Sequence, residues 1–172
     1  MSGSRKQQIE KVRARTALLE RGSEQDVAAG LRRCVGRLAT NHWLDPSSAF
    51  TTDSAAAVLC WTSERLTPMY DDLADYAAAS AVLHCADSWS YLGRAVNALS
   101  AGLVAEAVHL TYYSEVRAAI SLLAFSGIVV TNGDATHVLA GARTLLPVRG
   151  GRPAHSLWPL LTAWSAPPER LA

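Results

Sequence analysis

Two arginines and one histidine lie close together near the C-terminus of this 172-residue chain, in the stretch Arg149-Gly-Gly-Arg-Pro-Ala-His155. Arginine can neutralise a phosphate group through two parallel hydrogen bonds, and histidine can accept or give a proton near neutral pH. Arg149 and His155 could therefore cleave RNA without a metal, with the 2′-hydroxyl as nucleophile and Arg152 holding phosphate. The alternative is a basic loop whose histidine caps the following helix.

A second group of polar side chains follows the spacing of one helical face. Glu106, His109, Tyr113 and Arg117 are separated by three, four and four residues, so they share one side of a helix. A histidine, a phenol and a guanidinium in line could bind phosphate and move protons. The alternative is a hydrogen-bonded ladder that joins neighbouring helices.

These two patterns resemble those of a known family. The stretch from Leu110 to Leu123, Leu-Thr-Tyr-Tyr-Ser-Glu-Val-Arg-Ala-Ala-Ile-Ser-Leu-Leu, resembles the Tyr-Tyr-containing helix of HEPN domains. These are small helical bundles found with bacterial toxin, antiviral and nucleotidyltransferase systems. Arg149 and His155, with five residues between them, are similar to the Arg-x(4–6)-His ribonuclease motif of that family, although Gly150 stands where the family usually has a polar residue. The resemblance implies a dimer in which two such motifs meet in one cleft.

Patterns typical of metal or cofactor sites are missing from the sequence. It contains no Cys-x-x-Cys pair and no phosphate-binding loop, and Glu106 with His109 lacks the second such pair that a di-iron bundle needs. We therefore expect neither metal nor cofactor. The three cysteines are scattered and odd in number, which favours a reducing cytoplasm over a disulfide framework. No stretch reaches the ~18 apolar residues of a membrane helix, and the polar N-terminus is not a secretory signal.

Charge is unevenly distributed along the chain, although the formal net charge is +1. Residues 1–40 hold nine basic and four acidic side chains, residues 41–116 hold two and nine, and residues 117–172 hold five and two. We expect these segments to pair within the molecule. The alternative is a basic surface for phosphate and an acidic surface for a protein partner. The excess of arginine over lysine is typical of GC-rich bacterial genomes.

Apolar periodicity predicts helices over most of the chain. We expect them over 7–20, 23–38, 53–66, 69–83, 88–101, 103–125 and 154–164, with a connection at 41–52. Ser23 is the expected N-cap of the second helix. The helix beginning near Ser88 has the apolar stripe Trp89, Leu92, Val96 and Leu99. The stripe of the 103–125 helix is typical of a central bundle helix and consists of Val108, Tyr112, Val116, Ala119, Ile120 and Leu123.

The pattern changes after Gly127. Residues 128–131 are β-branched, and Asn132-Gly133-Asp134 is a turn signal, so a short hairpin is expected within 128–147. Residues 148–153 are expected to form a glycine-rich loop. The predicted fold is therefore mainly α. It is a single-domain helical bundle of about six to seven helices over residues 1–172, with a small β-hairpin before the C-terminal helix.

Three functions follow from these patterns. The first is a HEPN-like component of a bacterial defence or toxin-type system, a metal-independent endoribonuclease that binds RNA and acts as a homodimer or within a multiprotein complex. The second is a non-catalytic helical interaction subunit of a larger complex. It is favoured by the low charged share of 18% and the five tryptophans, because interface cores are depleted of charge and rich in aromatic side chains. The third, which has no motif of its own, is a small-molecule or nucleotide-binding bundle, and a deep pocket lined by His109, Tyr113 and Arg117 would support it.

Overall fold

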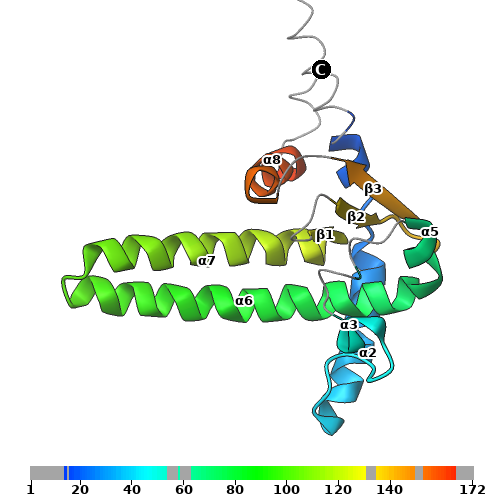
Figure 1. Cartoon of the computed structure of the whole chain (residues 1–172), viewed down its shortest axis with the longest axis horizontal. Coiled ribbons are helices and arrows are strands. Elements are labelled where there is room, and N and C mark those ends of the chain that lie inside the picture. Colours follow the sequence, from blue (N-terminus) through cyan, green and yellow to red (C-terminus); the bar gives the residue numbers. More distant parts are fainter. Residues whose placement is uncertain are drawn as a thin grey trace, which may run out of the picture.

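The fold is mainly helical, with a small antiparallel sheet before the C-terminal helix, which confirms the predicted fold class (Figure 1). The computed structural model describes residues 14, 16–53, 58, 63–130, 135–149 and 153–165. Its elements are α2 (Glu24–Arg37), η1 (Leu38–Thr40), α3 (Ala49–Thr52), α5 (Ser63–Leu66), η2 (Thr67–Met69), α6 (Tyr70–Ser100), α7 (Val104–Phe125), β1 (Ile128–Val130), β2 (Ala135–Leu139), β3 (Leu145–Arg149) and α8 (Pro153–Ser165). No described helix combines the length and the apolar character needed to cross a membrane.

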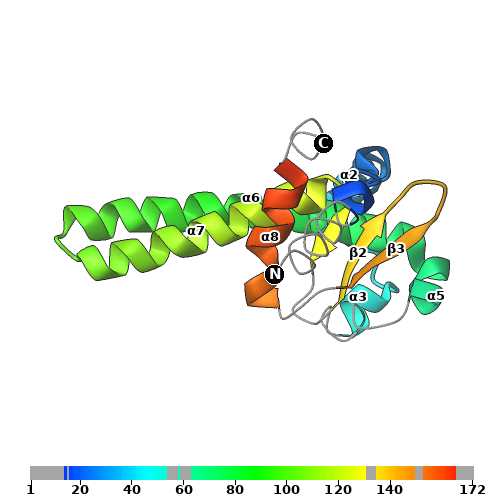
Figure 2. The same cartoon turned by 90° about the horizontal axis from the view of Figure 1, so that it is seen from above.

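Helices α6 and α7 form an antiparallel hairpin that extends well beyond the rest of the molecule in both views (Figures 1 and 2). We call the part of this hairpin from Val82 to Leu122 the arm. The prediction of separate helices over 69–83 and from Ser88 is wrong, because α6 is continuous over 31 residues. Its middle, from His84 to Ser88, contains no glycine or proline to break it. The hairpin turns at Gly102, where φ is 77° and a residue without Cβ is favoured.

Helix α2 crosses the first half of α6 at very short range. Gly30 makes this possible, because a Cβ there would lie 2.5 Å from the carbonyl oxygen of Ala74. The predicted N-cap is confirmed: Ser23 Oγ accepts a hydrogen bond of 3.3 Å from the Asp26 backbone N–H. The predicted connection over 41–52 is partly wrong, since its last residues form the short helix α3.

The sheet has the strand order β1-β2-β3, with both pairs antiparallel. It confirms the predicted hairpin and adds β3 as a third strand. The prediction of a loop over 148–153 is wrong at its start, because Val148 and Arg149 belong to β3 and lie opposite Thr136 and Ala135. Leu145 and Val148 are buried, and this burial draws the segment into the sheet. The predicted turn at 132–134 lies outside the described residues.

Buried side chains form two main clusters in the body of the molecule. In one, α2 and the first half of α6 pack with residues of the sheet around Leu73 and Ala77. In the other, the second half of α7 packs with the sheet and α8 around Ala119, Leu123 and Leu160. The predicted core stripe of α7 is therefore confirmed only in its second half. Its first half is exposed, because Val108 and Tyr112 lie on the arm, beyond the sheet and α8.

The basic and acidic segments of the chain pair within the molecule, as predicted. Asp75 of α6 is buried, and its two carboxylate oxygens accept hydrogen bonds of 2.7 Å from Arg33 and Arg37 of α2. Near the sheet, Arg143 lies 2.7 Å from Asp71. These contacts join the basic N-terminal and C-terminal segments to the acidic middle.

Candidate functional site

The predicted polar stripe of α7 does share one face of the arm, and its C-terminal member joins the two helices. Arg117 Nη1 lies 2.9 Å from His84 Nδ1 of α6, and Arg117 Nε lies 3.9 Å from a carboxylate oxygen of Asp87. Burial, and then the positive charge of Arg117, lower the pKa of His84. The imidazole is therefore held neutral, with Nδ1 accepting from the guanidinium. Arg117 therefore joins α7 to α6 through polar contacts, as the alternative interpretation of the stripe predicts.

Further along the arm the stripe becomes an aromatic cluster on the surface. The ring of His109 meets the edge of the Tyr113 ring at a centroid distance of 4.8 Å. Tyr113 stacks on Tyr91 of α6 at 5.6 Å, and the Arg94 guanidinium lies 5.7 Å from the Tyr91 ring centroid. His109 and Tyr113 are exposed. The cluster therefore presents polar aromatic edges to water and stabilises the arm from its outer side.

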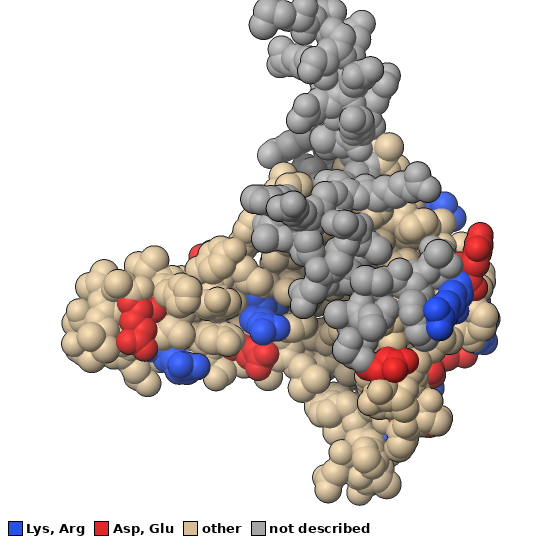
Figure 3. Space-filling model, viewed as in Figure 1, with Lys and Arg blue, Asp and Glu red and all other residues tan. Residues whose placement is uncertain are grey.

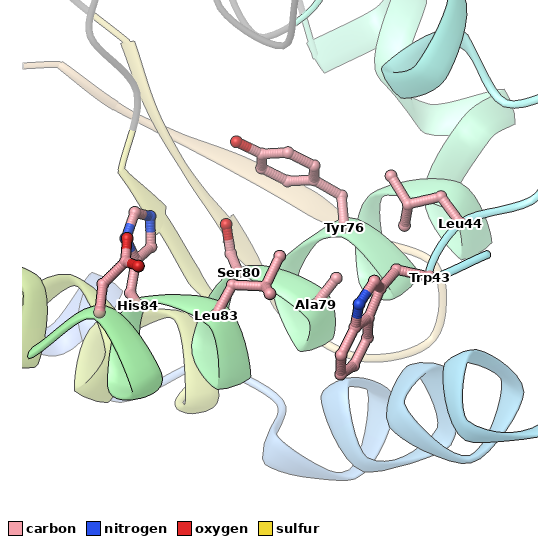
Figure 4. A pocket seen from close by; sticks show the side chains of 8 residues that line it. Trp43, Leu44, Tyr76, Ala79, Ser80, Leu83 and His84 are labelled. Atoms are coloured by element: carbon pink, nitrogen blue, oxygen red, sulfur yellow. The ribbon is translucent and has the colours of Figure 1, made fainter. Parts of the chain in front are cut away.

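A cavity of about 300 Å³ lies at the base of the arm (Figure 4). Its lining residues are Trp43, Leu44, Tyr76, Ala79, Ser80, Leu83, His84 and Asp87. Figure 4 shows Tyr76, Ser80 and His84 following one another along α6. The volume is at the lower end of the range for small-molecule sites. The predicted pocket residues His109, Tyr113 and Arg117 do not line this cavity, and Arg117 is linked to it through His84 and Asp87.

The residues of the Arg149 to His155 motif lie where β3 leads into α8. Arg149 is the last residue of β3, and His155 is the third residue of α8. Arg152 and the side chains of Arg149 and His155 lie outside the described part of the chain. Along α7, His109 is ten residues from Ala119, which packs in the same cluster as α8, a separation of about 15 Å. His109 therefore lies away from the part of α7 that packs with α8, whereas Arg117 is two residues from Ala119.

The arm exposes a set of large apolar side chains, several of which belong to the apolar stripes predicted from the sequence. Trp89 is 70% exposed, Val96 56% and Val108 65%. We call the set to which they belong the apolar arm face. Its members are Val82, Trp89, Leu92, Val96, Leu99, Leu103, Val104, Val108, Tyr112 and Leu122. Their periodicity was visible in the sequence, but their exposure was not.

Residues of the apolar arm face from both helices lie on the same side of the arm. Where α6 meets α7, Ser88 is hydrogen-bonded to Ser114, and Ala95 packs in one cluster with Ala107. Exposed apolar residues follow such contact residues by one position, as Trp89 follows Ser88, Val96 follows Ala95 and Val108 follows Ala107. One position rotates a side chain by about 100° around the helix axis. Because α6 and α7 are antiparallel, the same rotation carries both stripes to one side of the pair.

The opposite side of the arm is polar by the same geometry. Its residues precede the contact residues by one position, and they are Asp87, Ser90, Arg94 and Asn97 of α6 with Glu106, His109 and Tyr113 of α7. Figure 3 shows basic and acidic side chains at intervals along one side of the arm. The arm is therefore a layer of two helices with one apolar and one polar face, and no other described element of the chain covers the apolar face.

Comparison of the chain with known protein families, with curated proteins and with solved structures finds no match in any of the three. Among the described residues, no group of three or more histidine, cysteine, aspartate or glutamate side chains could hold a metal ion. The features on which a function can be argued are thus the apolar arm face, the polar contacts beside it, and the junction of β3 with α8.

Proposed function

We propose that this chain is a helical interaction module, a non-catalytic subunit that docks in a larger assembly through the apolar arm face. The observation that carries the proposal is the exposure of ten large apolar side chains on one side of the arm. The stripe of α6 from Val82 to Leu99 is about 26 Å long at 1.5 Å per residue. Contiguous apolar patches of this extent mark interaction sites on the surfaces of globular proteins.

The interior of the arm supports the same proposal. The buried cluster between the distal parts of α6 and α7 consists of Ala95, Ala98, Ala107 and Leu110, so little apolar area is buried inside the arm. The large side chains point outward instead. Covering them stabilises a complex by roughly 25 cal/mol for each Å² of apolar surface removed from water. Such a layer gains most of its apolar burial when a partner covers it.

Recovery of the complex from its native host tests the docking role. Full-length chain carrying an affinity tag is isolated with its bound proteins, and Val96→Glu is compared with Asn97→Glu. Both substitutions add one negative charge to exposed neighbouring positions of α6, but only Val96 belongs to the apolar arm face. We expect Val96→Glu to lose the bound proteins and Asn97→Glu to retain them. Equal recovery with both variants would contradict a docking role.

Ribonuclease activity of the HEPN type is a second proposed function, within a bacterial defence or toxin-type system. It is supported by the position of Arg149 at the end of β3 and of His155 in the first turn of the 13-residue helix α8. The chain thus brings both residues to one junction, and the N–H groups of a first helical turn favour bound phosphate. In this proposal Arg149 and His155 are the catalytic residues, and Arg152 holds phosphate. Three residues of α7 are further candidates for binding phosphate: His109, Tyr113 and Arg117.

Cleavage of RNA in the presence of EDTA tests this second function. Purified chain is incubated with single-stranded and with structured RNA, beside the variants His155→Ala and Arg149→Ala. We expect cleavage that each variant reduces at least 100-fold, an effect in the range of general acid–base catalysis. His42→Ala is the matched control, because His42 is exposed and outside both predicted sites. Absence of cleavage, or full activity of His155→Ala, would refute the ribonuclease proposal.

A further inference from the structure

We infer that the partner on the apolar arm face is a second copy of this chain, and that two arms pack face to face as a symmetric four-helix bundle. This inference rests on the docking role proposed above and names its partner.

The exposed residues of α6 have the spacing of a coiled-coil seam. Val82, Trp89 and Val96 are seven residues apart, and Leu92 and Leu99 lie at the complementary positions of the same repeat. Such a heptad stripe packs best against helices with the same repeat. A second copy supplies one, because every copy exposes the same stripe.

The length of the second stripe favours the same partner. On α7 the exposed residues run from Val104 to Leu122, which at 1.5 Å per residue is about 27 Å. The stripe of α6, from Val82 to Leu99, is about 26 Å long by the same measure. Two layers, each of two antiparallel helices with exposed stripes of nearly equal length, are the composition of a four-helix bundle. A two-fold axis then buries the same face of both copies, which is the commonest symmetry of protein dimers.

The area of the apolar arm face is close to what a stable dimer needs. Two adjacent helices, each about 10 Å wide, give a face about 20 Å across and about 26 Å long. This is about 500 Å² in projection, and side chains make the accessible area larger. A standard stable interface buries about 800 Å² on each partner. A dimer that uses the whole face therefore comes close to this size without any contribution from the body.

Charge complementarity also favours a second copy. On the side of the arm that bears the apolar face, all of it within the described residues, Glu115 is the one charged residue, and it lies at the level of Trp89. A strongly charged partner would find little to pair with there. Two copies of a chain with formal net charge +1 do not repel each other appreciably. A single polar residue in such a seam sets the register of the helices at a cost in stability.

Sedimentation of the full chain at 1 to 100 µM tests the inference. We expect a monomer–dimer equilibrium that lies well toward the dimer at 100 µM. Val96→Glu should raise the dissociation constant at least 30-fold, whereas the matched control Asn97→Glu should change it less than threefold. Because Glu115 is charged and lies in the seam, Glu115→Leu should lower the dissociation constant at least threefold. Circular dichroism and thermal unfolding of each variant show that it is folded, and Val96→Gln replaces any Val96→Glu protein that is not.

The outcomes separate this inference from the docking role. A wild-type chain that stays monomeric at 100 µM overturns the second copy as partner, and so does a dimer that Val96→Glu and Val96→Gln both leave intact. If the chain is monomeric and Val96→Glu still loses the proteins recovered from the host, the docking role stands and its partner is another chain. If the chain is monomeric and those proteins are recovered equally with both variants, both proposals are wrong.

Discussion

Ser88 of α6 and Ser114 of α7 are hydrogen-bonded to each other in a reciprocal way. Each hydroxyl donates to the backbone carbonyl oxygen of the other residue, at 3.0 Å and 2.9 Å, and the two hydroxyl oxygens lie 3.2 Å apart. Small side chains at this contact let the helices approach closely, and the bonds hold them in one register. This register places the apolar stripes of both helices on the same side of the arm.

Removing this contact should loosen the arm. Because a typical intramolecular hydrogen bond contributes about 1 kcal/mol net, Ser114→Ala should lower the free energy of unfolding by about 1 kcal/mol. Ser88→Ala should do the same, and the double variant should lose less than the sum, since both residues share one contact. Urea denaturation of the four proteins measures this coupling. Strictly additive losses would show that the two hydroxyls act independently.

The crossing of α2 over α6 depends on Gly30. A Cβ at this position would lie 2.5 Å from the carbonyl oxygen of Ala74, a backbone atom that cannot move without shifting α6. We expect Gly30→Ala to lower the free energy of unfolding by about 2 kcal/mol, as overpacking does in cores. Gly36→Ala is the control in the same helix, because a Cβ there meets nothing within 4 Å. It should raise stability by up to about 1 kcal/mol through helix propensity. Thermal unfolding distinguishes the two, and equal effects would contradict the close crossing.

The buried carboxylate of Asp75 should matter more for stability than the exposed one of Asp71. Asp75 holds Arg33 and Arg37 from a side chain that is only 4% exposed. Asp75→Asn leaves the two guanidinium groups without their counter-charge and should cost about 3 kcal/mol, the lower end for a broken buried pair. Asp71→Asn removes the contact with Arg143, in which both side chains are more than half exposed, and should cost at most about 0.5 kcal/mol. Chemical denaturation at pH 7 measures both, and similar losses would contradict this ranking.

Two histidines should make the fold sensitive to acid. Burial lowers the pKa of His137, and burial together with Arg117 lowers that of His84, from an ordinary value of 6.5. The folded chain therefore binds fewer protons at these sites than the unfolded chain does. Well above pH 6.5 the two histidines do not change the free energy of unfolding. Below pH 6.5 the free energy of unfolding falls as the pH drops. His84→Gln combined with His137→Leu should flatten the decline in melting temperature between pH 7 and pH 5. A decline as steep as in the wild type would contradict the assignment.

Much of the local structure could be predicted from the sequence, because it depends on neighbouring residues. The N-cap at Ser23, the end of α7 near Gly127 and the strand after it follow from residue types within a few positions. The shared face of His109, Tyr113 and Arg117 follows from helical spacing alone. The uneven distribution of charge also indicated the pairing that joins Asp75 to Arg33 and Arg37.

The sequence by itself determined that the chain is mainly helical, where most helices lie, and that Trp89, Val96 and Val108 belong to apolar stripes. Only the tertiary structure decided which parts of those stripes are covered. Ala119 and Leu123 are buried because the sheet and α8 return to that part of α7, while Val108, on the same helix, has no such cover and is 65% exposed. The physical reason is that helical periodicity records which side chains share a face. What covers that face depends on segments distant in the chain, or on another molecule.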